Sequence, residues 1–170
     1  MLNVVKTQVG SVRAEPELRI ANVYLETLTM VERLHRRLLD VIKDEFDRHG
    51  RSDVNAVQAL LLYNIADKEL TAGELRTRGY YLGSNVSYNV KKLVEMGFLH
   101  HARSRIDRRA VRISLTEKGR EVHMIVVGLY EKHAMTVEQI GGVMTEDFAR
   151  LNQSLSRLER FWTDQIKYRL

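Results

Sequence analysis

The 170 residues are 44% hydrophobic and 29% charged, with one proline and ten glycines, which predicts a mainly α-helical globular fold with a minor β component. No apolar run approaches the roughly 18 residues that a membrane-spanning helix needs, and residues 1–15 lack a signal-peptide core, so we expect a cytoplasmic protein. The absence of cysteine excludes disulfides and thiol chemistry, whereas the net charge of +5 is compatible with a polyanionic partner.

A long amphipathic helix is predicted from Pro16 to about Arg48, after an arm without periodicity. Proline suits the first turn of a helix, and apolar residues then recur at helical spacing until His49-Gly50 interrupts the pattern. Such a helix carries more apolar surface than a small domain covers, which favours a partner subunit. A helix that spans one monomeric core is the alternative.

A second helix is predicted to be capped by Ser52 or Asp53 and to end near Ile65. Residues 67–71 are too few for a helix and are expected to form a strand that pairs with a later hairpin. Thr71 then begins a capping-box pattern, which satisfies amide donors at a helix start. This third helix is expected to reach about Tyr81.

A short helix with one polar face is predicted between Ser84, a favoured N-cap residue, and Gly97, which has the character of a C′ glycine. Apolar residues recur at helical spacing on one side. Serine, asparagine, tyrosine and lysine occupy the other side. Together with the preceding helix, this arrangement predicts a helix-turn-helix.

A β-hairpin with a basic tip is predicted next, because a strand at 98–101 and an alternating strand at 111–115 flank a polar loop. From Arg103 to Arg112, five arginines accompany a single Asp107, a net charge of +4. A polar-faced helix followed by such a hairpin is the layout of a winged helix-turn-helix, sized for a DNA major groove. A solvated hairpin without a nucleic-acid partner is the alternative.

Two more helices are predicted after the hairpin. Thr116 caps the first, which continues into the 130s, and Gly141-Gly142 forms a break. Thr145–Asp147 caps the last helix, which carries apolar residues at steps of three and four. Its Phe161 and Trp162 need burial, which again suggests a partner.

The hairpin and the helix after it resemble the MarR family of bacterial transcription regulators. The family's wing pattern, Asp-x-Arg followed by a strand and Leu-Thr-x-x-Gly, falls on Asp107, Arg109, Leu115, Thr116 and Gly119. The order of elements fits the family over residues 18–168. Within the family, the chain is most similar to the regulators of L,D-transpeptidase genes called LdtR.

The resemblance implies a homodimer that binds double-stranded, pseudo-palindromic DNA. It divides the chain into an N-terminal arm and dimerisation helix (1–50), a winged helix-turn-helix domain (51–116, wing about 98–115) and C-terminal dimerisation helices (117–170). Arg109 is expected in the minor groove, steadied by Asp107. The expected DNA contacts are Thr71, Arg76, Arg78, Ser84, Asn85, Ser87, Tyr88, Asn89, Lys91, Lys92, Arg103, Arg105, Asp107, Arg108 and Arg109.

The resemblance also suggests a pocket for an apolar or phenolic anionic effector, where the dimerisation helices meet the winged domain. The expected lining is Leu34, His35, Leu38, Leu61, Tyr63 and Ile65. Plain core packing of these residues is the alternative.

The sequence offers little support for an enzyme, because it lacks paired catalytic carboxylates, a phosphate-binding loop and a metal motif. We expect no catalytic residue, cofactor or metal. The competing hypothesis is a helical adaptor whose basic hairpin binds a protein or an acidic surface without reading DNA sequence.

Overall fold

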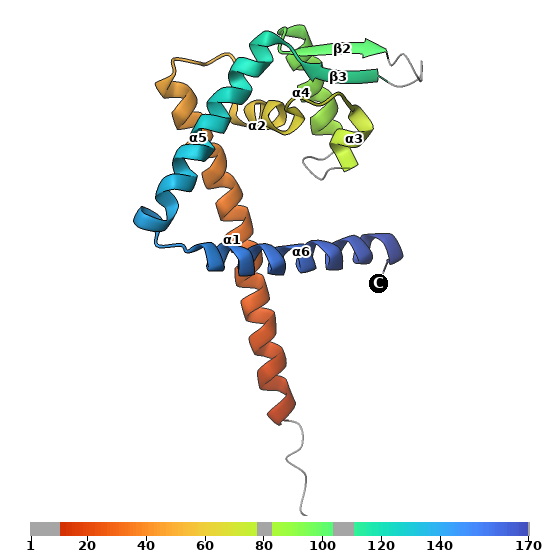
Figure 1. Ribbon diagram of the computed structural model, residues 1–170. Coiled ribbons are helices and arrows are strands. Elements are labelled where there is room, and N and C mark those ends of the chain that lie inside the picture. The colour runs from red at the N-terminus through yellow and green to blue at the C-terminus, as the bar shows by residue number, and fades with distance from the viewer. Residues whose placement is uncertain (1–10, 78–82, 104–110, 170) are drawn as a thin grey trace, which may run out of the picture. The chain divides into compact units, whose positions relative to one another are not determined.

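The computed structural model describes residues 11–77, 83–103 and 111–169 (Figure 1). The helices are α1 (Ser11–Arg48), α2 (Ala56–Ile65), α3 (Ala72–Thr77), α4 (Gly83–Glu95), α5 (Glu117–Gly141) and α6 (Thr145–Tyr168). The strands are β1 (Leu70–Thr71), β2 (Leu99–Arg103) and β3 (Val111–Leu115). The predicted mainly helical class with a small sheet is confirmed. The chain divides into two units, one ending at Gln58 and one beginning at Ala59.

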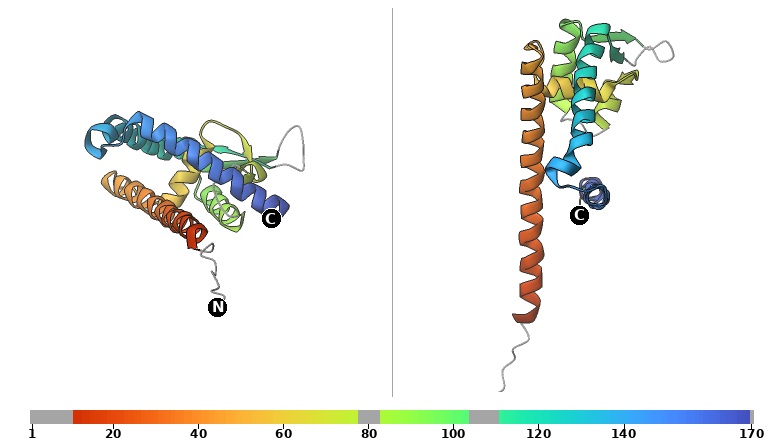
Figure 2. Two further views of the ribbon diagram at one scale, coloured as in Figure 1. Left: turned by 90° about the horizontal axis from the view of Figure 1, so that it is seen from below. Right: turned by 60° about the vertical axis from the view of Figure 1, so that its left-hand side comes forward.

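The first unit is dominated by the long helix α1, drawn in red and orange in Figure 2. Its end at Arg48 is as predicted, and Gly50 follows in the left-handed conformation with φ 64°. Its start at Ser11 precedes the predicted start at Pro16. Pro16 therefore lies in the second turn of α1, where a proline has no amide hydrogen to donate.

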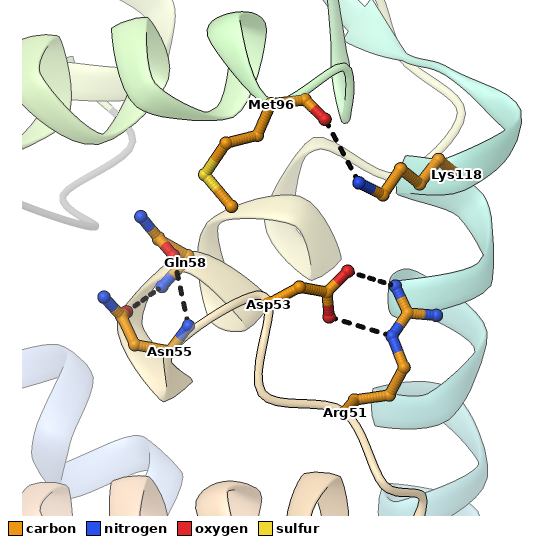
Figure 3. A network of polar contacts seen from close by, with 6 residues as sticks. All are labelled: Arg51, Asp53, Asn55, Gln58, Met96 and Lys118. Atoms are coloured by element: carbon orange, nitrogen blue, oxygen red, sulfur yellow. Dashed lines mark hydrogen bonds and ion pairs between the residues drawn. The ribbon is translucent and has the colours of Figure 1, made fainter.

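Asn55 provides the N-cap of α2, so the prediction of Ser52 or Asp53 is wrong. The Asn55 Oδ1 atom accepts a hydrogen bond of 2.9 Å from the Gln58 amide, and the Asn55 amide donates one of 3.1 Å to Gln58 Oε1 (Figure 3). The Asp53 carboxylate is instead held by the Arg51 guanidinium, with Nε and Oδ1 3.0 Å apart (Figure 3).

The second unit contains a three-stranded antiparallel sheet in the order β1-β3-β2. Leu70 pairs with Ile113, and Leu99 pairs with Leu115. The predicted strand before α3 therefore exists and pairs with the hairpin, although it is reduced to Leu70–Thr71. The four paired residues are all buried, so one face of the sheet belongs to the core.

The core of the second unit is built by α2, α3, α4, α5 and the sheet. Its largest fully buried side chains are Leu61, Leu62, Ile65, Leu75, Leu93, Phe98, Ile113, Val122 and Val126. The helices α3 and α4 contact one another, and α4 also contacts β2. The inner face of α4 is thereby fixed on a packed core, which leaves its other face outward.

The last helix leaves α5 at a corner formed around Gly142, which is left-handed with φ 64° (Figures 1 and 2). The Met144 amide donates to Asp147 Oδ2 at 3.1 Å and so caps the start of α6. None of the residues in α6 is buried. Within the described ranges, no helix is both long and apolar enough to span a membrane.

Candidate nucleic-acid interface

The helix α3 begins at the predicted capping box. The Thr71 amide donates to Glu74 Oε2 at 2.6 Å, and the Glu74 amide donates to Thr71 Oγ1 at 3.1 Å. These reciprocal bonds satisfy two donors that a helix start otherwise leaves unpaired. The helix is described to Thr77, and its predicted continuation to Tyr81 lies outside the described residues.

The polar-faced helix α4 begins at Gly83, one position before the predicted N-cap Ser84. Ser84 therefore lies inside the helix, and that N-cap prediction is wrong. The predicted stop is confirmed, since Gly97 is left-handed with φ 78°.

The two faces of α4 differ as the sequence predicts. Val86, Val90 and Leu93 are buried. Tyr88 is 62% exposed, and the side chain of Lys91 is 78% exposed. Among the other predicted contacts on this helix, Ser87 and Lys92 are exposed and Asn89 is half-buried. The described outer face therefore combines an aromatic ring, short polar side chains and two lysines.

Glu95 is a member of this face that the sequence reasoning missed. Its carboxylate lies 4.0 Å from Lys91 Nζ and 3.3 Å from Lys92 Nζ. The spacings of three and four residues are the signal that could have predicted both pairs. Exposed pairs of this kind contribute little to stability, so both lysines can exchange the carboxylate for another hydrogen-bond acceptor.

The strands β2 and β3 lie side by side (Figure 1), and their pairing extends to Arg103 and Val111. Several predicted contacts lie outside the described residues, namely Arg78, Arg105, Asp107, Arg108 and Arg109. The structure describes the backbone but not the side chains of Arg76, Ser84, Asn85 and Arg103. Their roles stay predictions from the sequence.

An aromatic cluster joins α2 to α5. The rings of Tyr63 and His123 stack with centroids 5.5 Å apart, and Tyr130 meets Tyr63 edge-on at 5.0 Å. Burial and the neighbouring Tyr63 raise the pKa of Tyr130. The His123 Nδ1 atom is buried without a hydrogen-bond partner among the described residues. Of this cluster, the sequence singled out Tyr63 alone, because its partners are distant in the chain.

The other residues of the predicted effector pocket have mixed environments. Leu61 and Ile65 are fully buried, and Leu38 is half-buried. Leu34 and His35 are exposed in this single chain. The predicted pocket itself stays a prediction.

A separate pocket of about 360 Å³ lies at the corner between α5 and α6. Its lining residues are His133, Ala134, Val137, Glu138, Val143, Thr145 and Phe148. Most of this lining is apolar, and Phe148 links it to the exposed face of α6.

Comparison with known proteins identifies the fold and the family. Residues 54–119 match the family model described as a winged helix DNA-binding domain. Over 148 residues, 85% of this chain and 74% of the relative, the chain is 34% identical to the exopolysaccharide II synthesis transcriptional activator ExpG of Rhizobium meliloti (strain 1021).

Solved structures agree at the level of the fold. The transcriptional regulator SlyA matches with a TM-score of 0.70 and 19% identity, over 85% of this chain and 99% of SlyA. AbsC, a MarR family transcriptional regulator from Streptomyces coelicolor, matches with a TM-score of 0.64 and 19% identity, over 85% of this chain and 95% of AbsC.

These similarities are to transcriptional regulators and not to enzymes. The identity to ExpG extends over most of both chains, and the family model covers the elements α2 to β3 that support the polar face of α4. The chain is thus a DNA-binding transcriptional regulator that belongs to the same family as ExpG, and its winged helix fold is the one seen in SlyA and in the MarR family regulator AbsC.

Proposed function

We propose that the protein is a homodimeric regulator that binds a pseudo-palindromic operator, with α4 in the major groove and the hairpin tip in the minor groove. The observation that carries this proposal is the polarity of α4. Its apolar side is buried in the core, while Tyr88 and Lys91 project outward from the same helix. An exposed helix of this size fits the width of a major groove.

The side chains of α4 suit different bases. Asparagine recognises adenine, lysine recognises guanine, and serine is permissive, which assigns base reading to Asn85, Lys91 and Ser87. In the wing, Arg109 would occupy the minor groove. The negative electrostatic potential of a narrow minor groove attracts the arginine side chain. The neighbouring arginines of the loop would bind phosphates and thereby fix the register.

A Tyr88→Ala variant tests whether α4 reads base sequence. We expect it to lose roughly 1–3 kcal/mol of operator binding while its binding to random duplex DNA changes little. Fluorescence anisotropy with the protein's own upstream promoter and with scrambled DNA measures both affinities. Equal losses on the two DNAs would show that Tyr88 does not read bases.

The proposed dimer is supported by large apolar side chains that a single chain leaves exposed. On α1, Ile20 is 67% exposed and Leu34 is 57% exposed. On α6, Phe161 is 50% exposed and Ile166 is 80% exposed. Apolar faces of this extent mark protein interfaces, and a second copy is the usual partner in a symmetric dimer.

The proposed effector is an apolar or phenolic anion bound near Tyr63. This placement is supported by the stacked Tyr63 and His123 rings and by the unpartnered His123 Nδ1 atom, because effector sites combine apolar walls with a few polar groups. Such a ligand changes operator affinity only if it binds more tightly to the dimer with one spacing of the two winged domains than to the dimer with another spacing.

Titrating salicylate and larger phenolic acids into the protein–operator complex tests this regulation. We expect release of the operator at ligand concentrations that leave the free protein dimeric. Ligand binding without any change in operator affinity would remove the regulatory role. The assignment to the LdtR subgroup stays a prediction, and binding to promoters of L,D-transpeptidase genes would test it.

A further inference from the structure

The C-terminus of α4 is closed by a regular hydrogen-bond pattern. The Gly97 amide donates to the Val94 carbonyl at 3.0 Å, and the Phe98 amide donates to the Leu93 carbonyl at 2.8 Å. With Gly97 left-handed, this is a Schellman motif. The motif satisfies carbonyls within the last turn, and the carbonyls of Met96, Gly97 and Phe98 that follow need donors from elsewhere.

Those donors come from the start of α5. The Lys118 Nζ atom donates to the Met96 carbonyl at 3.2 Å (Figure 3). The Thr116 hydroxyl donates to the Gly97 carbonyl at 2.7 Å, and the Thr116 amide donates to the Phe98 carbonyl at 3.1 Å. Three successive carbonyls after α4 are therefore bound by residues at the beginning of α5.

Thr116 connects the two helices through a single hydroxyl group. Its Oγ1 atom also accepts a hydrogen bond of 3.1 Å from the Gly119 amide, which makes Thr116 the N-cap of α5. One hydroxyl thus donates to the end of α4 and accepts from the start of α5.

Lys118 adds a charge to this connection. Its ammonium lies 4.1 Å from the centroid of the Phe98 ring, which is fully buried. It also lies at the C-terminal end of α4, where the helix dipole favours a cation. The side chain of Lys118 therefore links the start of α5 to the end of α4. Lys118 and Met96 are 22 residues apart in the chain.

We propose that Lys118 and Thr116 are positioning residues for DNA recognition, which lock the end of α4 to the start of α5 without touching bases. The proposal rests on the proposed role of α4 as the recognition helix. Without these contacts, the end of α4 would be less fixed in the free protein and would have to be ordered when α4 enters a groove. Because that ordering costs free energy, the affinity for the operator would fall. Non-specific binding depends mainly on phosphate charge, so it is less sensitive to the orientation of α4.

A Lys118→Met variant tests this role, since methionine retains much of the apolar stem and removes the charged donor. We expect it to lose operator affinity about fivefold, the size of a helix-terminus charge contact, with little change on scrambled DNA. Lys118→Arg, which keeps a cationic donor, should retain most of the wild-type selectivity. Lys132→Met removes the same charge from an exposed position further along α5 and serves as the matched control.

The dependence of operator affinity on salt separates positioning from direct contact. A phosphate contact by Lys118 would reduce the slope of log K against log salt by about 0.9 on its removal. We expect the slope of Lys118→Met to equal that of the wild type. A reduced slope, or an unchanged ratio of operator to scrambled affinity, would overturn the proposal.

Thr116 supplies a second pair of variants for the case that Lys118→Met does not fold. Thr116→Ser keeps the bridging hydroxyl, whereas Thr116→Val keeps the shape and removes it. Selectivity lost in the valine variant and retained in the serine variant supports the positioning role, and equal selectivity in both contradicts it. If the wild type itself shows no operator preference, the proposed function of α4 has failed and the positioning role falls with it.

Discussion

A Gly119→Ala variant is expected to be less stable than the wild type by about 1–3 kcal/mol, the usual cost of overpacking a core. Gly119 is buried in the first turn of α5. A Cβ atom at this position would lie 2.2 Å from the Phe98 carbonyl oxygen and 3.2 Å from its carbon. The obstacle is backbone, so the start of β2 must move away from α5.

Gly128→Ala is the matched control for this prediction, because it makes the same change on the same helix. Apart from its chain neighbours and the nearby backbone of its own helix, no atom of the described residues lies within 4 Å of a Cβ built at Gly128. We expect this control to be neutral or to stabilise the helix by up to about 1 kcal/mol. Urea unfolding at one fixed protein concentration measures both variants. Equal stability of the two would mean that α5 and β2 are not packed as closely as described.

The displacement caused by Gly119→Ala should also weaken operator binding. The end of α4, the start of β2 and the start of α5 share the hydrogen bonds of Thr116, so they move together. We therefore expect the remaining folded protein to show a lower ratio of operator to scrambled affinity than Gly128→Ala.

An operator with half a helical turn inserted between its half-sites is expected to lose specific binding altogether. A two-fold symmetric dimer presents its recognition helices to half-sites about 10 base pairs apart. An insertion of about five base pairs turns one half-site to the opposite face of the duplex. One α4 can then reach its bases, and the second cannot.

Substituting the base pairs between the half-sites without changing their number is the control for this insertion. We expect a smaller effect from such substitutions, because neither α4 is expected to contact these positions. Sedimentation equilibrium of the protein in the same buffer measures its oligomeric state. Unchanged affinity for the lengthened operator, or a monomer at micromolar concentration, would contradict the symmetric dimer.

The features that the sequence predicts best are local ones. The capping box of Thr71 and Glu74, the N-cap Thr116 and the C′ glycine Gly97 are all confirmed. Each depends on residues within a few positions along the chain, so short patterns are sufficient. The strand ending at Thr71 was also predicted, because its length excluded a helix.

The features that the sequence misses depend on contacts between distant residues or on choices between similar ones. Asp53 and Asn55 are equally good N-caps by residue type, and only the folded chain shows that Asn55 caps α2 while Asp53 pairs with Arg51. The bond from Lys118 to Met96 and the stacking of Tyr63 on its histidine partner require the folded chain. No periodic pattern contains that information.

The most direct measurement of base reading by α4 is protection of the operator from dimethyl sulfate. This reagent methylates guanine at N7, in the major groove, and adenine at N3, in the minor groove. We predict protected guanines in two successive major grooves about 10 base pairs apart, with protected adenines where the hairpin tips enter the minor groove. Bound DNA whose guanines react as in free DNA would contradict the placement of α4. That result would favour a basic hairpin that binds DNA without reading its sequence.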